Sequence, residues 1–416
     1  MNSIPHLKTS RFNVEIALNG RYQDQVILYN VFSQGFSVLQ RKVWERLKAG
    51  SWDGEMLPYV ERCRDQFFLV NTSLDETRLL TARKHEIAYD TRSLAFKVAV
   101  TDHCNFACAY CVEEGYRNKR HMNDDCARQC TSFIIDQIKL YRPKKVFLDF
   151  GGGEPLLNIP VMIVMGDHVS VYCRGAGIDS HMALTTNGSL LSPKRVDRLR
   201  QSGLNLIRIT LLPQELHDQL RRTRRGEPTF DRIVSNLESI KGMVEVHLVA
   251  QYISDDPEAV QVIRSWLNHL EMRNLKGAIT DVHLSPILRR EYGINHPDEL
   301  CGDLGRFEDY QIMVEEVRAC GFPVMDGPPA MDCMANRKGK ISIDPSGNLT
   351  VCPVMMGHRE LDVGTVDQGI DPVQESQVIT RPLPARCLEE CVLGPRCNGG
   401  CRQQALIRYG SFDDIY

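Results

Sequence analysis

Short apolar runs separated by turns open the chain, and helical spacing follows them. Within residues 1–90 the apolar positions adopt helical spacing from about Gln40 and again from about Glu55. Ahead of those helices, apolar runs bounded by turn residues predict strands near 13–18, 25–31 and 36–39. This order predicts a small α+β module that is similar to a winged helix.

A regular rhythm replaces that pattern over residues 95–285, where apolar strands alternate with helical segments. One helix begins with Ser192 and Pro193, a good cap and first-turn pair. Parallel strands need helical crossovers, so the alternation predicts a parallel sheet. Six units are too few for a closed eight-fold barrel, and we predict an α/β fold with a partial (β/α)6 TIM-like barrel. The predicted strands lie at 96–101, 146–150, 181–186, 206–211, 245–252 and 281–285.

The rhythm is lost over residues 286–416, which are rich in Cys, Pro and Gly. Short strands within 340–344 and 349–352 flank a turn at 345–348. Such a segment cannot bury much apolar area by itself, so bound metal would account for its order. We therefore predict three domains, at 1–90, 95–285 and 286–416.

Composition narrows the classes of function. The 416 residues are 43% apolar and 25% charged, which is typical of a globular protein, and 50 basic against 53 acidic side chains give a net charge of −3. That balance leaves no basic footprint for nucleic acid. No apolar run approaches the roughly 18 residues of a membrane helix. The N-terminus has no signal-peptide pattern, so we expect no membrane partner and a cytoplasmic protein.

The cysteines carry the most information. There are fifteen, of which five lie between Cys104 and Cys130 and eight between Cys301 and Cys401. A secreted disulfide scaffold is short and carries a secretory signal, whereas clustered cysteines in a long cytosolic chain favour metal binding.

Cys104, Cys108 and Cys111 form a C-x3-C-x2-C triad directly after the first predicted barrel strand. Three thiolates on one loop can hold three irons of a four-iron cluster and leave the fourth iron open to a small molecule. A zinc loop or three reduced bystander cysteines are the alternatives that the spacing leaves open. The position favours catalysis, because loops at the C-terminal ends of barrel strands carry the chemistry of barrel enzymes.

Two further polar loops follow the second and third predicted strands. In the first, Gly151–Pro155, glycines let a ligand approach the backbone, and the Glu154 carboxylate could accept an ammonium group. Taken alone, this loop is better explained as a tight strand–helix turn. The second loop, Thr185–Gly188, adds hydroxyl and amide groups, and alone it indicates an Asx-type turn. Three polar loops in succession at one rim are much less expected by chance than any one of them.

The order C-x3-C-x2-C, GGEP and TNG resembles the radical S-adenosylmethionine (radical SAM) enzymes over about residues 95–285. The resemblance implies that the three cysteines of the triad ligate a 4Fe-4S cluster whose free iron binds S-adenosylmethionine (SAM). One electron from the cluster would release a 5′-deoxyadenosyl radical, which abstracts hydrogen from a substrate carbon. We identify no catalytic side chain beyond the cluster.

The same resemblance assigns residues to SAM. The GGEP loop would bind its amino end, Asn187 would contact the ribose or carboxylate, and Tyr110 would pack near the adenine. Phe106 is expected in the core instead. The SAM-binding residues that we predict are Tyr110, Gly152, Gly153, Glu154, Thr186, Asn187 and Arg221.

One stretch after the fourth strand departs from the family pattern. His217, Asp218 and Arg221 match the fourth-strand region of peptide-modifying members, but Leu212-Pro213 stands where those members usually have Asp-Gly. Three more arginines follow within four residues of Arg221. This basic patch is either a solvated surface or a contact for an anion or a peptide.

The late cysteines resemble the SPASM extension, which binds auxiliary four-iron clusters in peptide- and protein-modifying enzymes. The last group opens with C-x3-C where the family usually has C-x2-C. The resemblance implies two groups of three ligands, Cys333, Cys352 and Cys401 in the first and Cys387, Cys391 and Cys397 in the second. Asp413 or Asp414 is a hypothetical fourth ligand of the second group. A single zinc or one auxiliary cluster is the alternative.

Some cysteines match no motif, and we expect them to be small buried hydrophobic residues. They include Cys126, Cys130, Cys173, Cys301 and Cys320.

The N-terminal module resembles the start of maturases of ribosomally synthesised peptides, where a winged-helix element accepts an extended peptide at a sheet edge. A domain used only for packing or dimerisation is the alternative. We predict a radical SAM oxidoreductase that modifies a ribosomal peptide precursor, for example by cross-linking, with a flavodoxin or ferredoxin as electron donor. An anaerobic sulfatase-type maturase that acts on a protein Ser or Cys is the second hypothesis. A non-catalytic zinc or iron–sulfur protein is the third.

Overall fold

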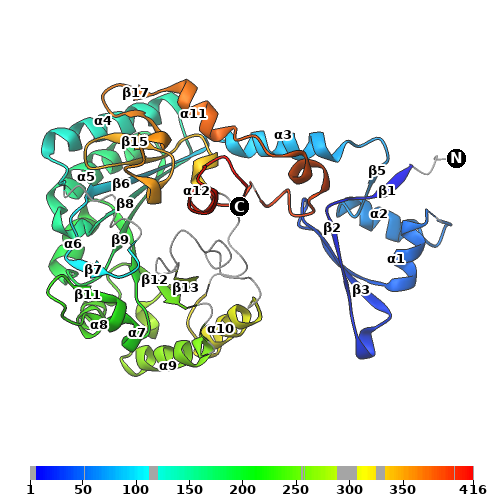
Figure 1. The fold of residues 1–416 in the computed structure, drawn as a ribbon, viewed down its shortest axis with the longest axis horizontal. Coiled ribbons are helices and arrows are strands. Elements are labelled where there is room, and N and C mark those ends of the chain that lie inside the picture. Colours follow the sequence, from blue (N-terminus) through cyan, green and yellow to red (C-terminus); the bar gives the residue numbers. More distant parts are fainter. Residues whose placement is uncertain are drawn as a thin grey trace.

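The computed structural model describes residues 6–50, 52–111, 120–253, 256, 258–287, 307–324, 333–397 and 399–415 (Figure 1). At its centre, six strands follow one another in chain order, and each is parallel to the next. They are β6 (Ser93–Thr101), β8 (Lys145–Gly152), β9 (Asp179–Thr186), β10 (Leu204–Thr210), β12 (Glu245–Tyr252) and β13 (Asp281–Pro286). The prediction of six units in an open, partial α/β barrel is confirmed.

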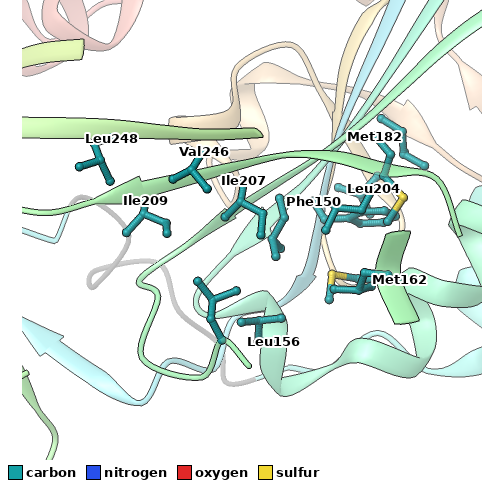
Figure 2. Packing of buried hydrophobic residues seen from close by; sticks show 14 of the residues in the cluster. Phe150, Leu156, Met162, Met182, Leu204, Ile207, Ile209, Val246 and Leu248 are labelled. Atoms are coloured by element: carbon teal, nitrogen blue, oxygen red, sulfur yellow. The ribbon is translucent and has the colours of Figure 1, made fainter. Parts of the chain in front are cut away.

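Helices cover the outer face of this sheet (Figure 1). Residue Ser192 caps α6 by accepting the N–H of Arg195, as its sequence predicts. Strand residues such as Phe150, Ile207 and Leu248 are almost fully buried and belong to one core with Met162 of α5 (Figure 2). The helices on this face are α4 (Asp124–Tyr141), α5 (Ile159–Gly175), α6 (Pro193–Gln201), α8 (Phe230–Ser239), α9 (Ala259–Met272) and α10 (Phe307–Ala319).

The C-terminal segment extends the barrel sheet, which the sequence did not predict. Strand β14 (Lys340–Ile343) pairs in parallel with β6, and three antiparallel strands follow it to complete a ten-stranded sheet. Ile341, Ile343 and Val351 join the same hydrophobic core as the barrel. The added elements are β15 (Asn348–Thr350), β16 (Asp362–Thr365), β17 (Gly369–Ile370), α11 (Pro372–Ile379) and α12 (Arg402–Tyr409).

The N-terminal residues form a separate small module with its own core around Leu28, Trp44 and Phe68. Its three-stranded antiparallel sheet and two helices match the predicted order. A second strand pair and a long helix, α3, were not predicted, and α3 bridges the module and the barrel (Figure 1). The elements are β1 (Leu7–Thr9), β2 (Asn13–Ala17), β3 (Gln25–Asn30), β4 (Phe36–Gln40), α1 (Arg41–Lys48), α2 (Leu57–Asp65), β5 (Leu69–Asn71) and α3 (Glu76–Ala88).

Two further findings concern the whole described chain. Among the described residues no helix is both long and apolar enough to cross a membrane. None of the fourteen described cysteines forms a disulfide, and their predicted binding of metal stays a prediction. Cys130 and Cys173 are buried as expected, whereas Cys126 and Cys320 are partly exposed and Cys301 lies outside the described residues.

Candidate active site

The three predicted loops meet at one rim of the barrel. Each follows the C-terminal end of a parallel strand, β6, β8 or β9, so all three emerge on the same side. The backbone N–H of Glu154 donates to His103 O at 2.7 Å, and Asn187 Nδ2 donates to Asn105 Oδ1 at 2.9 Å. Direct hydrogen bonds therefore join the cysteine loop to both other loops.

The Glu154 carboxylate links the second and third loops by hydrogen bonds, and we call this set of hydrogen bonds the latch. Its carboxylate is fully buried and accepts Thr186 Oγ1 at 2.7 Å, Asn187 N–H at 2.8 Å and Leu156 N–H at 3.0 Å. Burial raises the pKa of Glu154, while these hydrogen bonds and the charge of Arg221 act in the opposite direction. Because protein donors already occupy both carboxylate oxygens, this loop would offer a ligand its backbone rather than the Glu154 carboxylate.

Close packing explains the glycines of the second loop. Gly152 has φ +103°, and a Cβ there would lie 2.5 Å from Thr101 O. At Gly153 a Cβ would lie 2.2 Å from His103 O. Any side chain would therefore push the second loop away from the cysteine loop.

Asn187 orders the third loop and approaches the first cysteine. Its Oδ1 accepts the N–H and the hydroxyl of Ser189, at 2.9 and 2.7 Å. Its Nδ2 lies 3.9 Å from Cys104 Sγ, which also accepts the Phe106 N–H at 3.4 Å. Hydrogen bonds of this kind to a ligating sulfur tune iron–sulfur centres. The predicted contacts of Asn187 and Thr186 with SAM stay predictions.

A pair of short strands supports the cysteine loop, and the sequence did not reveal it. We call this pair the brace. Strand β7 (Phe106–Cys108) pairs with the antiparallel strand β11 (Arg221–Thr223), which follows α7 (Gln214–Leu220). Arg224 Nε also donates to Cys104 O at 2.7 Å. Each strand has three residues, too few for an apolar period to reveal them.

The predicted basic patch is therefore divided. Arg221 is buried, whereas Arg222, Arg224 and Arg225 are exposed, and Arg224 is tied to the cysteine loop. The run thus provides one interior cation and three surface cations instead of a single patch.

Arg221 places a buried cation beside the triad. Its Nη1 donates to Tyr110 Oη at 2.9 Å, and that hydroxyl donates to Gln251 Oε1 of β12 at 2.5 Å. Burial lowers the pKa of Arg221, but Tyr110 and the thiols of Cys108 and Cys104 outweigh it, so the pKa is raised. No described residue accepts a hydrogen bond from its Nε. The structure adds Gln251 to the site, which no motif indicated.

His217 and Asp218 anchor the brace rather than face the rim. His217 is fully buried, accepts Leu212 N–H at 3.2 Å through Nδ1, and therefore donates from Nε2 to Thr229 Oγ1 at 3.1 Å. Burial, helped by the charge of Arg221, lowers its pKa to about 3. Asp218 Oδ1 accepts the N–H groups of Thr229 and Phe230 and so caps α8.

The donor set at the rim fits a 4Fe-4S cluster with one open iron. It provides three cysteines outside any disulfide, with Cys104 buried and Cys108 and Cys111 half-buried, and the Arg221 cation interacts with the thiols of Cys104 and Cys108. No three His, Cys, Asp or Glu side chains of the described residues gather as they would around a single metal ion. The thiols of a four-iron cluster each bind a different iron and so stand farther apart.

The first C-terminal group also comes together in the fold. Burial, together with the neighbouring thiols of Cys333 and Cys401, raises the pKa of Cys352 to about 12. These three cysteines lie apart in the sequence, yet the thiols of Cys333 and Cys401 act on that of Cys352, and their role as ligands of one cluster stays a prediction. They can hold metal if they are deprotonated, which bound metal itself promotes.

Lys84 of α3 lies beside the second group. Its Nζ donates to Cys397 O at 2.8 Å, and the thiols of Cys397, Cys387 and Cys391 counter the lowering of its pKa by burial.

One buried arginine, Arg381, interacts with cysteines of both groups. Arg381 is 7% exposed, and its pKa is lowered by burial against the charges of Asp413, Cys397, Asp414 and Cys333. Its Nη2 has no hydrogen-bond partner among the described residues, as expected for a donor that faces the place of a bound cluster.

Asp413 is oriented toward a different partner from the one we predicted. Its Oδ1 lies 3.3 Å from Arg402 Nη1, and its side chain is 70% exposed. Its role as a fourth cluster ligand, like that of Asp414, stays a prediction.

Comparisons with known proteins agree with this geometry. Residues 98–253 match the radical SAM superfamily. A GTP 3′,8-cyclase of Rhizobium leguminosarum bv. trifolii is 27% identical over 204 residues, which are 46% of this chain and 54% of the relative. The chain thus spans about half the length of the curated relatives it matches.

Solved structures of similar fold cover more of the chain. The structure of anSMEcpe with bound AdoMet and a Cp18Cys peptide covers 78% of this chain and 92% of its own, with 15% identity and a TM-score of 0.57. Streptococcus suis SuiB bound to S-adenosylmethionine covers 98% of both chains, with 16% identity and a TM-score of 0.54.

Proposed function

We propose that residues 98–253, which match the radical SAM superfamily, form a radical SAM domain, and that the chain modifies a ribosomal peptide precursor by radical chemistry. The domain implies a 4Fe-4S cluster and SAM as cofactors. Cys104, Cys108 and Cys111 would hold the cluster, which when bound supplies the electron that cleaves SAM to methionine and a 5′-deoxyadenosyl radical. The latch at Glu154 and Asn187 fixes the neighbouring loops, and Tyr110 lines the site.

The observation that carries the peptide assignment is the open edge of the N-terminal sheet. Within the described residues, β4 pairs with β3 alone. Asn30 N–H donates to Gly35 O, and Arg41 N–H donates to Asp24 O. In an antiparallel pair, the backbone N–H and C=O groups of successive residues point alternately toward the partner strand and away from it. The backbone groups of Ser37 and Leu39 therefore point toward β3, and those of the intervening residues point toward the open edge. An extended peptide can add there as a strand.

Apolar side chains accompany that edge. Phe36 is 58% and Val38 42% exposed, and Val38 lies in register with Ile27 and, across it, Ile16. Streptococcus suis SuiB has also been solved bound to its precursor peptide SuiA, and that fold extends over 98% of this chain, including the N-terminal module. Both observations support a peptide partner. An external one-electron donor of the flavodoxin or ferredoxin type would complete the system.

A first experiment tests the radical chemistry. The anaerobically reconstituted chain should produce 5′-deoxyadenosine from SAM and dithionite, and should hold more iron than one cluster requires. The Cys104→Ala, Cys108→Ala, Cys111→Ala variant should produce none and keep the excess iron. Cys173→Ala, at a buried thiol far from the predicted groups in sequence, is the control. Zinc in place of iron, with no cleavage, would establish the non-catalytic alternative.

A second experiment tests the substrate class. A synthetic peptide encoded by a short reading frame beside the gene should bind the chain and gain a mass change that depends on SAM. Val38→Pro removes an N–H at the open edge of β4 and should weaken binding at least tenfold. Val38→Ala keeps that N–H and should weaken it less. Glu15→Pro, at the opposite edge of the sheet, is the matched control.

The outcomes separate the remaining hypotheses. Modification of a Ser or Cys in a folded protein, with no effect of Val38→Pro, would favour a sulfatase-type maturase, the activity class of the second hypothesis. Turnover of GTP would instead place the chain with the cyclases it partly matches.

A further inference from the structure

One face of helix α3 packs against the loop that carries Cys387–Cys397. Thr77, Leu80 and Lys84 are three or four residues apart and therefore lie on the same side of the helix. Leu80 is fully buried, and a Cβ added at Gly394 would lie 3.0 Å from its Cδ2. Thr77 Oγ1 lies 3.4 Å from Leu388 O, which also accepts a hydrogen bond from Arg11.

Lys84 is the charged member of that face. Its Nζ donates to Cys397 O at 2.8 Å and is partly buried. The charges that act on it include those of Cys397, Cys387 and Cys391, which form the second group of predicted ligands. In Figure 1, α3 crosses from the N-terminal module to the C-terminal segment, so a residue of the first part of the chain lies at a site formed by the last part.

We infer that Lys84 is a positioning residue that raises the reduction potential of the iron–sulfur cluster proposed on Cys387, Cys391 and Cys397. The inference rests on the auxiliary part of the proposed function. A reduced cluster carries one more negative charge than an oxidised one, so a fixed cation a few ångströms away stabilises the reduced form. The net charge near a cluster is one of the determinants of its potential.

The contact of Lys84 Nζ with Cys397 O at 2.8 Å places its charge beside this group, and the thiols of the group act on its pKa. Removal of Lys84 should therefore shift the signal of the cluster proposed on this group.

The test is a redox titration of the full-length chain, with dithionite as reductant and electron paramagnetic resonance as the readout. The Cys104→Ala, Cys108→Ala, Cys111→Ala background removes the signal of the rim cluster. Lys84→Met, similar in shape and neutral, should lower the ratio of reduced to oxidised cluster at the parental midpoint about tenfold, which is about 59 mV for one electron. Lys84→Arg should stay near the parent. Arg83→Met removes a cation from the exposed side of the same helix and should shift nothing.

The iron content of each variant shows whether it still assembles its iron–sulfur clusters. Loss of one cluster in Lys84→Met with recovery in Lys84→Arg supports a role for the charge. Loss in both variants assigns Lys84 to backbone packing and overturns the inference. An unchanged midpoint in Lys84→Met overturns it as well, and so does full iron retention in a Cys387→Ala, Cys391→Ala, Cys397→Ala variant. SAM cleavage by the chain with an intact rim triad reports separately on the proposed function.

Discussion

The rim cysteines and the C-terminal cysteines are held in place by opposite strategies. Cys104–Cys111 is one short loop, and its supports are loops and strands of the same barrel, chiefly the Glu154 latch and the β7–β11 pair. The six later cysteines are spread over residues 333–401, and buried or partly buried cations lie near them, Arg381 and Arg402 from the same region and Lys84 from the distant helix α3. The compact motif is supported by strand pairing and hydrogen bonds, whereas the dispersed cysteines are accompanied by cations, one of them from the other end of the chain.

Removal of the Glu154 carboxylate should have the largest effect of these changes, and the effect should be confined to the rim. Glu154→Ala leaves three buried donors without an acceptor, so we expect a loss of about 3–5 kcal/mol in the free energy of unfolding and no 5′-deoxyadenosine. Urea denaturation and product analysis measure both. The C-terminal iron should remain. Wild-type stability in this variant would contradict the latch.

Arg402→Met is the corresponding change in the C-terminal region. Arg402 is 2% exposed and reaches Asn336 Oδ1 and Asp413 Oδ1, both at 3.3 Å. Its loss should destabilise the chain by about 1–3 kcal/mol and release C-terminal iron, with SAM cleavage retained. Arg198→Met, at an exposed helix position, is the control. Loss of cleavage before loss of iron would show that the two regions are not independent.

His217 gives the barrel side a pH dependence. The folded pKa of about 3 lies below the ordinary value of 6.5, so the unfolded chain binds the proton first as pH falls. The stability from neutral His217 is complete above pH 6.5 and is lost toward pH 3, by up to about 1.4 kcal/mol per pH unit. His217→Gln should flatten that part of the curve, as urea midpoints between pH 7 and about 5 would show. The same pH dependence of stability in the parent and in His217→Gln would contradict this role of His217.

The smallest expected effect concerns the cap of α8. Asp218→Ala removes the acceptor of the Thr229 and Phe230 N–H groups and should lower the free energy of unfolding by about 1 kcal/mol. Asp218→Asn retains a capping oxygen and should differ little from the parent in thermal unfolding. Equal losses in both variants would mean that charge, and not capping, matters at this position.

The predictable features are those with a local signature. The strand periods, the Ser192 cap and the three rim loops all appear in runs of a few residues, and the fold confirms them. Contacts between distant segments leave no such signature. Strand β11, the pair of Tyr110 with Gln251, and the contact of Lys84 with Cys397 each depend on how the chain returns to the same place.

The continuous ten-stranded sheet also changes how the chain can be divided. Because β14 occupies the flank of β6 over Ala95–Val98, the first barrel strand is an interior strand. A chain cut at residue 286 would present β6 as a bare edge, which invites pairing between molecules. Expression of the barrel without its C-terminal partner should therefore give aggregates, whatever its cofactors, and the boundary that the cysteine pattern suggests is not a line along which the protein can be dissected.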